Sequence, residues 1–121
     1  MKSKSTGISE LTKKKVQAKH CRCFECQSTF GLSYSHILKK QWYSNYDDPD
    51  NIVLDCIDCH HIWDNGTFLQ KSKLNSIDRR MDIIYRLFEK SFGETKIKIQ
   101  QRYNTLVYGL NDCGKDYEFI E

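Results

Sequence analysis

Two C-x-x-C pairs constrain this chain more than any other feature of its sequence. Cys23 and Cys26 form the first pair, Cys56 and Cys59 form the second, and 29 residues separate them. The N-terminal segment carries lysines but no apolar export signal, so disulfides are not expected. Four thiols at this spacing are typical of a tetrahedral structural zinc site. Zinc–thiolate bonds would supply folding free energy to a chain of 121 residues, a length that suits one domain with a modest core.

Two alternatives remain open at this zinc site. Cys21 could replace Cys23 as a ligand, and His60, directly after the second pair, could complete a mixed thiolate–imidazole site. Otherwise Cys21 and Cys113 are expected to be buried or unreactive thiols, as unpaired cysteines commonly are.

Charge is spread unevenly along the chain, although the net charge is only +3. Residues 1–22 carry seven basic groups and one acid, whereas residues 44–64 carry six acids and no Lys or Arg. A carboxylate-rich centre between basic segments suits a cation site held against a polyanion; an unevenly charged, solvated surface is the other interpretation. No apolar run approaches the roughly 20 residues of a membrane helix, so we expect an intracellular, cytoplasmic protein without membrane contact.

Periodicity and turn residues predict the elements of the first half of the chain. A helix capped by Ser9 is expected to reach about His20. Apolar and small residues alternate over 30–36, which is the period of a strand, and the polar residues 44–50 predict a loop. Residues 52–56 are expected to form a second short strand.

The second half is predicted to be mostly helical. A short helix over 57–65 is expected to stop at Gly66, and apolar residues recur at intervals of three and four over 74–93, as in an amphipathic helix. Residues 95–104 fit a strand or a helix equally well. The expected fold class is therefore α+β, with a small zinc-stapled core and flanking helices. We divide the chain into a basic arm and short helix (1–20), a zinc-bound core (21–70) and a helical extension packing on the core (71–121).

The residues with catalytic potential follow this order of elements. His36 ends the first predicted strand and Asn51 precedes the second, while His60 and Asp64 lie one turn apart and therefore on one face of the following helix. If the two strands form a hairpin, an imidazole on a strand faces a metal site on a helix. The pattern predicts a strand–strand–helix unit with zinc at its ends.

At these residues the sequence resembles the HNH, or ββα-metal, nuclease superfamily, many members of which carry two C-x-x-C pairs around the motif. The order is the same here: cysteine pair, His36, Asn51, then C-x-x-C-H at 56–60. The resemblance covers about residues 21–66. The flanking segments resemble, more loosely, phage recombination nucleases of the NinG type.

The resemblance implies an endonuclease that hydrolyses DNA phosphodiester bonds. His36 matches the general base that removes a proton from the attacking water, and Asn51 matches the residue that orients its ring. His60 and Asp64 match ligands of a catalytic Mg²⁺ or another divalent cation, which would hold a phosphate oxygen. The expected products carry 5′-phosphate and 3′-hydroxyl ends.

The sequence departs from the family at Ser35, where members usually place an Asp, His or Glu that binds the metal. A neutral hydroxyl is a poor ligand for a hard cation. Either Ser35, His60 and Asp64 hold the ion weakly with waters, or His61, Asn65 or Asp55 substitutes, or catalysis has been lost.

Simpler structural interpretations also apply. His36 could be a packed histidine, Asn51 a turn former and Asp64 a polar residue near a helix end. Four aromatic residues could stack on bases or fill the core: Trp42, Tyr43, Tyr46 and Trp63.

Nucleic-acid contacts are expected from lysines around this unit, which would hold phosphates without reading sequence. They are Lys13, Lys14, Lys15, Lys39 and Lys40. Arg79 and Arg80 follow as weaker candidates, and a solvated helix face is the alternative for all of them. The expected partner is duplex or branched DNA, bound by a monomer or a homodimer. A non-cleaving zinc-dependent DNA- or RNA-binding module is the main alternative function, and a zinc-ribbon domain that binds proteins is a third.

Overall fold

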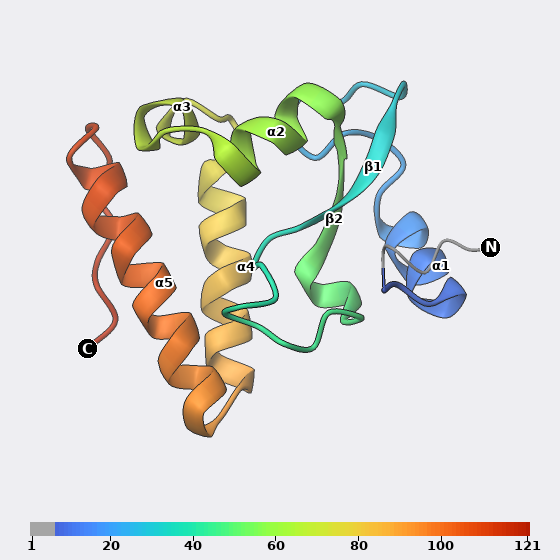
Figure 1. Ribbon diagram of the computed structural model, residues 1–121. Helices are drawn as coiled ribbons and strands as arrows, with labels where there is room; N and C mark the ends of the chain where they lie inside the picture. Colours follow the sequence, from blue (N-terminus) through green and yellow to red (C-terminus); the bar gives the residue numbers. More distant parts are fainter. Residues whose placement is uncertain (1–6) are drawn as a thin grey trace.

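The computed structural model describes residues 7–121, so part of the predicted basic arm lies outside the described residues. Within them the chain is a small α+β protein with a two-stranded sheet, five α-helices and a short 3-10 helix (Figure 1), which confirms the α+β part of the predicted fold class. The elements are α1 (Glu10–Lys19), β1 (Leu32–His36), η2 (Pro49–Asn51), β2 (Ile52–Cys56), α2 (Ile57–Asn65), α3 (Phe68–Ser72), α4 (Ile77–Lys90) and α5 (Gly93–Asn111). None of these helices is both long and apolar enough to cross a membrane.

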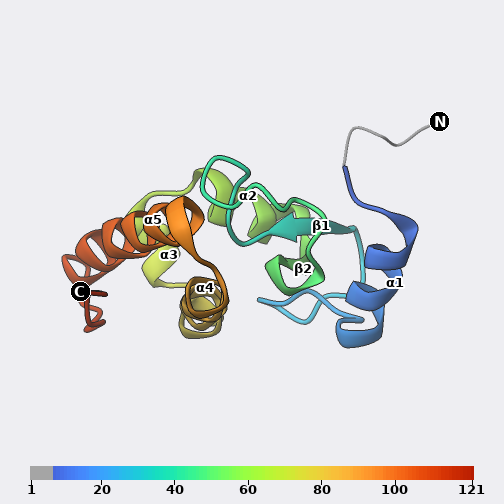
Figure 2. The same cartoon turned by 90° about the horizontal axis from the view of Figure 1, so that it is seen from below.

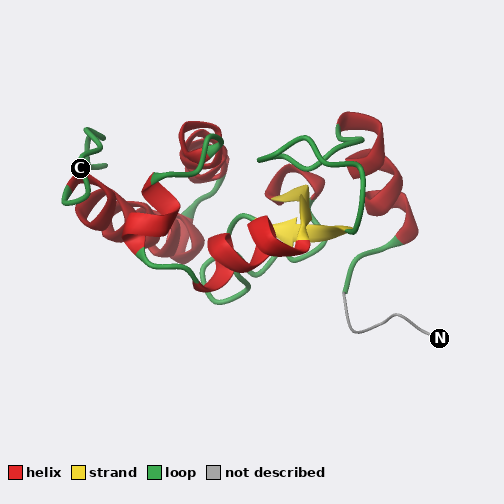
Figure 3. Ribbon diagram, turned by 90° about the horizontal axis from the view of Figure 1, so that it is seen from above, coloured by secondary structure: helices red, strands yellow, loops and turns green. Residues whose placement is uncertain are grey.

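The sheet is the antiparallel hairpin that the sequence predicts. β1 pairs with β2 in a register that sets Leu32 opposite Cys56 and His36 opposite Ile52. Figure 3 shows this sheet in yellow among the helices, which are red. The helix α2 follows β2 directly and leads from that end of the sheet toward α4 (Figure 1). It ends at Asn65, capped by Gly66, as predicted. The strand–strand–helix order is therefore present in space as well as in sequence.

Two apolar clusters hold the sheet between helices. Val16 of α1 packs with Ile52 and Leu54 of β2 in the smaller cluster. The larger cluster joins Val53 of β2 and Trp63 of α2 to the buried faces of α4 and α5. Figure 2 shows α1 and the α4–α5 pair at opposite ends of the molecule with the sheet between them. Removal of this apolar surface from water is the main force that holds the helices on the sheet.

A buried ion pair connects α4 to β2. Arg80 is fully buried and donates to both carboxylate oxygens of Asp55, at 2.7 and 3.0 Å, and to Ser76 at 2.7 Å. Both sequence interpretations of Arg80, a phosphate contact and a solvated residue, are therefore wrong. The suggestion that Asp55 substitutes as a catalytic metal ligand is also wrong, because Arg80 occupies its carboxylate. Arg79 stays exposed and donates to the carbonyl of Phe24.

Residues 95–104, which fitted either structure, belong to the helix α5. Its buried residues Ile99, Tyr103, Leu106 and Leu110 recur at intervals of three and four, whereas Ile97, which suggested a strand, is exposed. The short helix α3 was not predicted.

A capping box marks the start of α3, with Thr67 and Gln70 each bonding the other's backbone N–H. The T-x-x-Q pattern at 67–70 was the available signal for this helix.

Candidate functional site

The four predicted zinc ligands converge on one point. The sulfur atoms of Cys23, Cys26, Cys56 and Cys59 all lie within 4.8 Å of one another, and those of Cys26 and Cys56 are 3.7 Å apart. Four sulfurs placed about 2.3 Å from one zinc ion in a tetrahedron would be about 3.8 Å apart. All six cysteines are free. The donor set therefore fits a tetrahedral zinc ion.

Local structure explains this convergence. The first pair sits in a tight turn before β1, in which Gln27 has a positive φ of 67°. Cys56 is the last residue of β2 and the N-cap of α2, so Cys59 falls in the first helical turn. Burial and the neighbouring thiols raise the pKa of Cys59, so a cation is needed to hold all four sulfurs as thiolates.

The alternatives at the zinc site are not realised. Cys21 is exposed and lies outside the sulfur cluster, while Cys23 is inside it. His60 is not part of the cluster either. Cys113, which is partly buried at the end of α5, also lies apart.

His60 instead belongs to a second group of polar side chains on α2. Its Nε2 lies 3.1 Å from Oδ2 of Asp64, and its Nδ1 lies 2.8 Å from the hydroxyl of Ser33 on β1. The hydrogen bond with Asp64 raises the pKa of His60. Burial raises the pKa of Asp64, but the hydrogen bond to His60 together with the positive charges of His60, Lys39 and His36 holds that pKa below its usual range. Ser33, which sequence reasoning missed, thus fixes the ring of His60.

His36 is held at the end of β1 by the loop that follows. Its Nε2 lies 2.9 Å from the carbonyl oxygen of Tyr46, and its ring stacks on the Tyr46 ring with centroids 3.7 Å apart. A carbonyl only accepts hydrogen bonds, so Nε2 carries the proton and Nδ1 keeps its lone pair. Burial lowers the pKa of His36, which keeps the ring neutral at physiological pH.

The structure brings His36 near the α2 pair but not into contact with it. Strand alternation turns His36 to the same side as Tyr34, whereas Ser33 turns toward α2. The negative charge of Asp64 nevertheless raises the pKa of His36, and the positive charge of His60 lowers it. The three groups therefore share one electrostatic environment.

Ser35 is fully buried, and its hydroxyl has no hydrogen-bond partner among residues 7–121. Alternation places it on the α2 side of β1, like Ser33. A buried hydroxyl without a partner is uncommon and marks a place where a ligand or water is expected.

Asn51 does not touch the ring of His36. Its buried side chain accepts from the backbone N–H of Leu38 and donates to the Leu38 carbonyl, at 2.8 and 2.9 Å. It therefore fixes the chain two residues beyond His36, and any influence on the imidazole passes through the backbone. His61 and Asn65, the other suggested substitutes for Ser35, are exposed. Nδ2 of Asn65 lies 3.4 Å from Nδ1 of His61.

The candidate lysines fall into two groups. Lys39 donates to the carbonyl oxygen of Asp64 at 3.1 Å, and the ammonium of Lys40 lies 5.8 Å from the centre of the Tyr46 ring. These two lysines therefore flank the two halves of the candidate site.

The other lysines lie on α1. Lys13 pairs with Glu10 and leans over Tyr34, while Lys14 and Lys15 are exposed. Within residues 7–121, none of these three side chains has a hydrogen bond or ion pair with His36, His60 or Asp64.

Of the four aromatic candidates, Trp63 and Tyr43 are buried in the core. Trp42 is partly buried, and Tyr46 supports His36.

Among the described residues, the six acids of 44–64 do not converge on one point, since the sulfur cluster is the only group of three or more potential metal ligands there. Asp48 and Asp50 both pair with Lys90, at 2.7 and 3.1 Å, and Asp50 also pairs with Lys19. Asp47 accepts from the backbone N–H of Ser9. These carboxylates hold the loop between the strands against α1 and α4.

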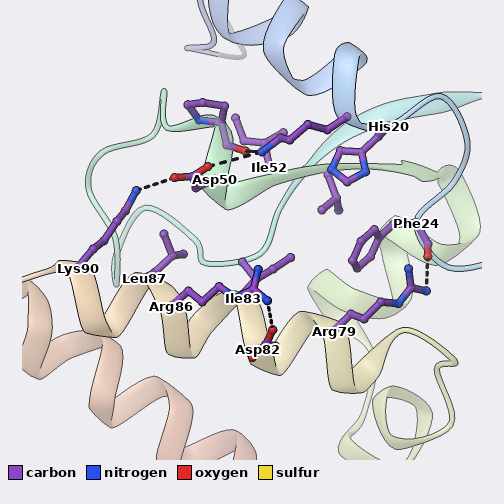
Figure 4. A pocket seen from close by; sticks show the side chains of 13 residues that line it. His20, Phe24, Asp50, Ile52, Arg79, Asp82, Ile83, Arg86, Leu87 and Lys90 are labelled. Atoms are coloured by element: carbon purple, nitrogen blue, oxygen red, sulfur yellow. Dashed lines mark hydrogen bonds and ion pairs between the residues drawn. The ribbon is translucent and has the colours of Figure 1, made fainter.

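A cavity of about 520 Å³ lies between α1, β2 and α4, away from the candidate site (Figure 4). Four basic side chains line it: Lys19, Arg79, Arg86 and Lys90. Each has an acceptor within the chain, for example Asp82 at 2.6 Å from Arg86 and Asp50 at 3.5 Å from Lys19. Dashed lines in Figure 4 mark the contacts of Arg79, Arg86 and Lys90. The cavity contains neither His36 nor the α2 pair.

Two further basic residues, one of them close enough to Asp64 to respond to its charge, were not found by sequence reasoning. Lys71 of α3 is buried against the rings of Trp63 and Phe68, and burial lowers its pKa to about 8. The guanidinium of Arg102 on α5 lies 4.4 Å from the centre of the Trp42 ring. Neither lies near the cysteine motif in sequence, so no local pattern pointed to them.

No family model, curated protein or solved structure matches this chain.

Proposed function

We propose that the protein is a zinc-stapled, metal-dependent endonuclease that hydrolyses DNA phosphodiester bonds with His36 as general base. The observation that carries the proposal is that the charges of His60 and Asp64, which pair on α2, both act on His36 at the end of β1, with the three residues in the order of the HNH motif. Support for it comes from contacts on both sides: Tyr46 holds the base, and Ser33 holds the ring of His60.

The residues on α2 fit a divalent cation. Two ligand atoms that each lie about 2.1 Å from one ion at roughly a right angle are about 3 Å apart. Nε2 of His60 and Oδ2 of Asp64 are 3.1 Å apart. Ser33 bonds the other ring nitrogen, as neighbours of metal-bound histidines commonly do. The partnerless hydroxyl of Ser35 is a third, weaker donor on the same side of β1.

When bound, the cation would supply charge neutralisation at a phosphate oxygen and at the leaving 3′-oxygen. Nδ1 of His36 is the nitrogen that accepts the proton of the attacking water, because Nε2 is committed to the Tyr46 carbonyl. The same carbonyl holds the ring after protonation and stabilises the imidazolium. His36 does not contact the α2 pair, so the scissile phosphate would lie between them.

Asn51 is a positioning residue in this proposal. Its side chain clamps the backbone of Leu38 and so sets the end of β1 from which His36 projects. Small displacements of a catalytic group cost large factors in rate, which makes such a clamp important although it touches no reacting atom.

A non-cleaving DNA- or RNA-binding module is the second candidate. The neutral, buried Ser35 favours it, because only His60 and Asp64 remain as strong ligands for a hard cation.

A plasmid-nicking assay with Mg²⁺, Mn²⁺ or Ni²⁺ distinguishes the two candidates. The nuclease proposal predicts metal-dependent nicking by the zinc-loaded protein and a loss of orders of magnitude in His36→Ala, with duplex binding retained. His20→Ala is a matched control, because His20 lies at the end of α1 beside Phe24 and not at the candidate site. Equal nicking by wild type and His36→Ala would contradict the assignment of the base, and binding without nicking would favour the second candidate.

A further inference from the structure

Three basic side chains from different elements act on one another electrostatically, and two of them, Lys39 and Lys71, also act on or respond to the charge of Asp64. Lys39 follows β1, Lys71 lies in α3 and Arg102 lies in α5. Lys39 bonds the Asp64 carbonyl oxygen, and the charges of Lys39 and Arg102 both act on Lys71. Among residues 7–121, none of the three forms an ion pair with a carboxylate.

This arrangement is costly unless an anion joins it. Lys71 is only 6% exposed, and its ammonium lies 5.5 Å from the centre of the Trp63 ring. Ring faces attract cations, but they do not replace a counter-ion for a buried charge. The charge of Asp64 acts on Lys71, but its carboxylate is paired with His60, so three like charges stand against one shared acid. Such an excess of like charge is destabilising, and proteins commonly retain it where an anionic ligand binds.

We propose that Lys39, Lys71 and Arg102 bind a phosphate of the nucleic-acid backbone, next to the phosphodiester that His36 would attack. This inference rests on the proposed function, since it assigns the neighbouring phosphate of the same substrate. Guanidinium and ammonium groups are the usual phosphate ligands of proteins. Lys39 connects the cluster to Asp64, so a strand that enters the candidate site carries its next phosphate toward Lys71 and Arg102.

Binding of a labelled duplex, followed by fluorescence anisotropy without added Mg²⁺ on the zinc-loaded protein, tests this phosphate site. Lys71→Met is expected to weaken binding about 5- to 10-fold and to reduce the slope of log affinity against log salt by about 0.9. Arg102→Gln, on another helix, is expected to act in the same direction. Lys73→Met is the matched control, because Lys73 is exposed at the end of the same helix as Lys71.

Unchanged affinity and salt slope in both Lys71→Met and Arg102→Gln, with melting temperatures that show folded proteins, would overturn the phosphate site. Competition with poly-glutamate and with pyrophosphate gives a second test. If poly-glutamate displaces the duplex as effectively as pyrophosphate does, the phosphate site is overturned in favour of a site for an acidic peptide.

The nicking assay separates the two proposals. Nicking that depends on His36, combined with unchanged binding by both variants, overturns the phosphate site alone. Binding that depends on Lys71 without any nicking supports the phosphate site and overturns the nuclease.

Discussion

Two buried cations lie against the same indole ring and differ in how their charges are balanced. The guanidinium of Arg80 lies 5.3 Å from the centre of the Trp63 ring, and the ammonium of Lys71 lies 5.5 Å from it. Arg80 is matched by both oxygens of Asp55, whereas Lys71 has no carboxylate partner among the described residues.

The difference separates a structural charge from one that is free to bind a ligand. Arg80 ties α4 to β2 beside the sulfur cluster, where Asp55 lies 3.8 Å from the sulfur of Cys23. Lys71, in contrast, responds to the charge of Asp64, a residue of the candidate site. We therefore expect changes on the Arg80 side to affect folding, and changes on the Lys71 side to affect binding.

The largest effect on folding stability is expected from loss of the zinc ion, whose sulfur cluster lies beside the Arg80–Asp55 pair. Cys56→Ser removes one thiolate, and structural zinc contributes on the order of 10 kcal/mol to small domains, as much as their whole stability. The variant should lose its zinc and its cooperative thermal transition, measured by elemental analysis and circular dichroism. Cys113→Ser, outside the cluster, is the control. Full zinc retention with an unchanged melting temperature in Cys56→Ser would contradict a structural role for the thiolates.

The next effect is expected from Arg80 itself. Arg80→Met leaves the buried Asp55 carboxylate without its partner, which costs about 3–5 kcal/mol of unfolding free energy in urea titrations. The double variant Asp55→Asn/Arg80→Met should recover part of this loss, since it leaves no buried charge. A loss below about 1 kcal/mol in the single variant would show that the two buried cations do not differ as described.

Lys71 is expected to have a smaller effect on the unfolding free energy, and its buried charge should lower stability where the Arg80 ion pair raises it. Burial lowers its pKa from 10.5 to about 8, so the unfolded chain holds more protons than the folded protein between about pH 8 and 10.5. Unfolding free energy should therefore rise with pH across that window in the wild type, by about 3 kcal/mol at most, relative to Lys71→Met. Urea titrations at several pH values measure the difference. A wild-type curve parallel to that of Lys71→Met would mean that Lys71 bears no unbalanced charge.

The smallest effect is expected from Lys90, a basic residue already paired at the surface. Lys90→Met removes contacts with Asp48 and Asp50 and should cost about 1 kcal/mol or less of unfolding free energy. Duplex affinity should stay unchanged, because this charge is satisfied within the chain. A fall in affinity as large as that of Lys71→Met would remove the distinction between paired and unpaired cations.

The sequence predicted the elements and contacts whose signals are local. Cysteine spacing located the sulfur cluster, strand alternation placed His36 at the end of a strand that pairs with the next one, and Gly66 marked the end of α2. The one-turn interval between His60 and Asp64 also correctly predicted that their side chains meet.

Contacts between distant segments could not be predicted in this way. Arg80 has the sequence surroundings of a surface residue, and only the packing of α4 on β2 buries it against Asp55. The convergence of Lys71 and Arg102 likewise depends on how α3 and α5 pack, which no spacing in the chain encodes. The acids of the central loop looked unpaired in the sequence, which suggested a cation site. Their basic partners on α1 and α4 lie far away in sequence and were therefore not recognised.

The central claim is that His36, His60 and Asp64 act on one phosphodiester. Crystals of the zinc-loaded His36→Ala variant with a short duplex and Mn²⁺ test it most directly, because the anomalous signal of manganese locates the ion. We predict manganese bound by Nε2 of His60 and the carboxylate of Asp64, in contact with a phosphate on the side of residue 36. Manganese and phosphate bound elsewhere, with zinc in the sulfur cluster, would contradict the account.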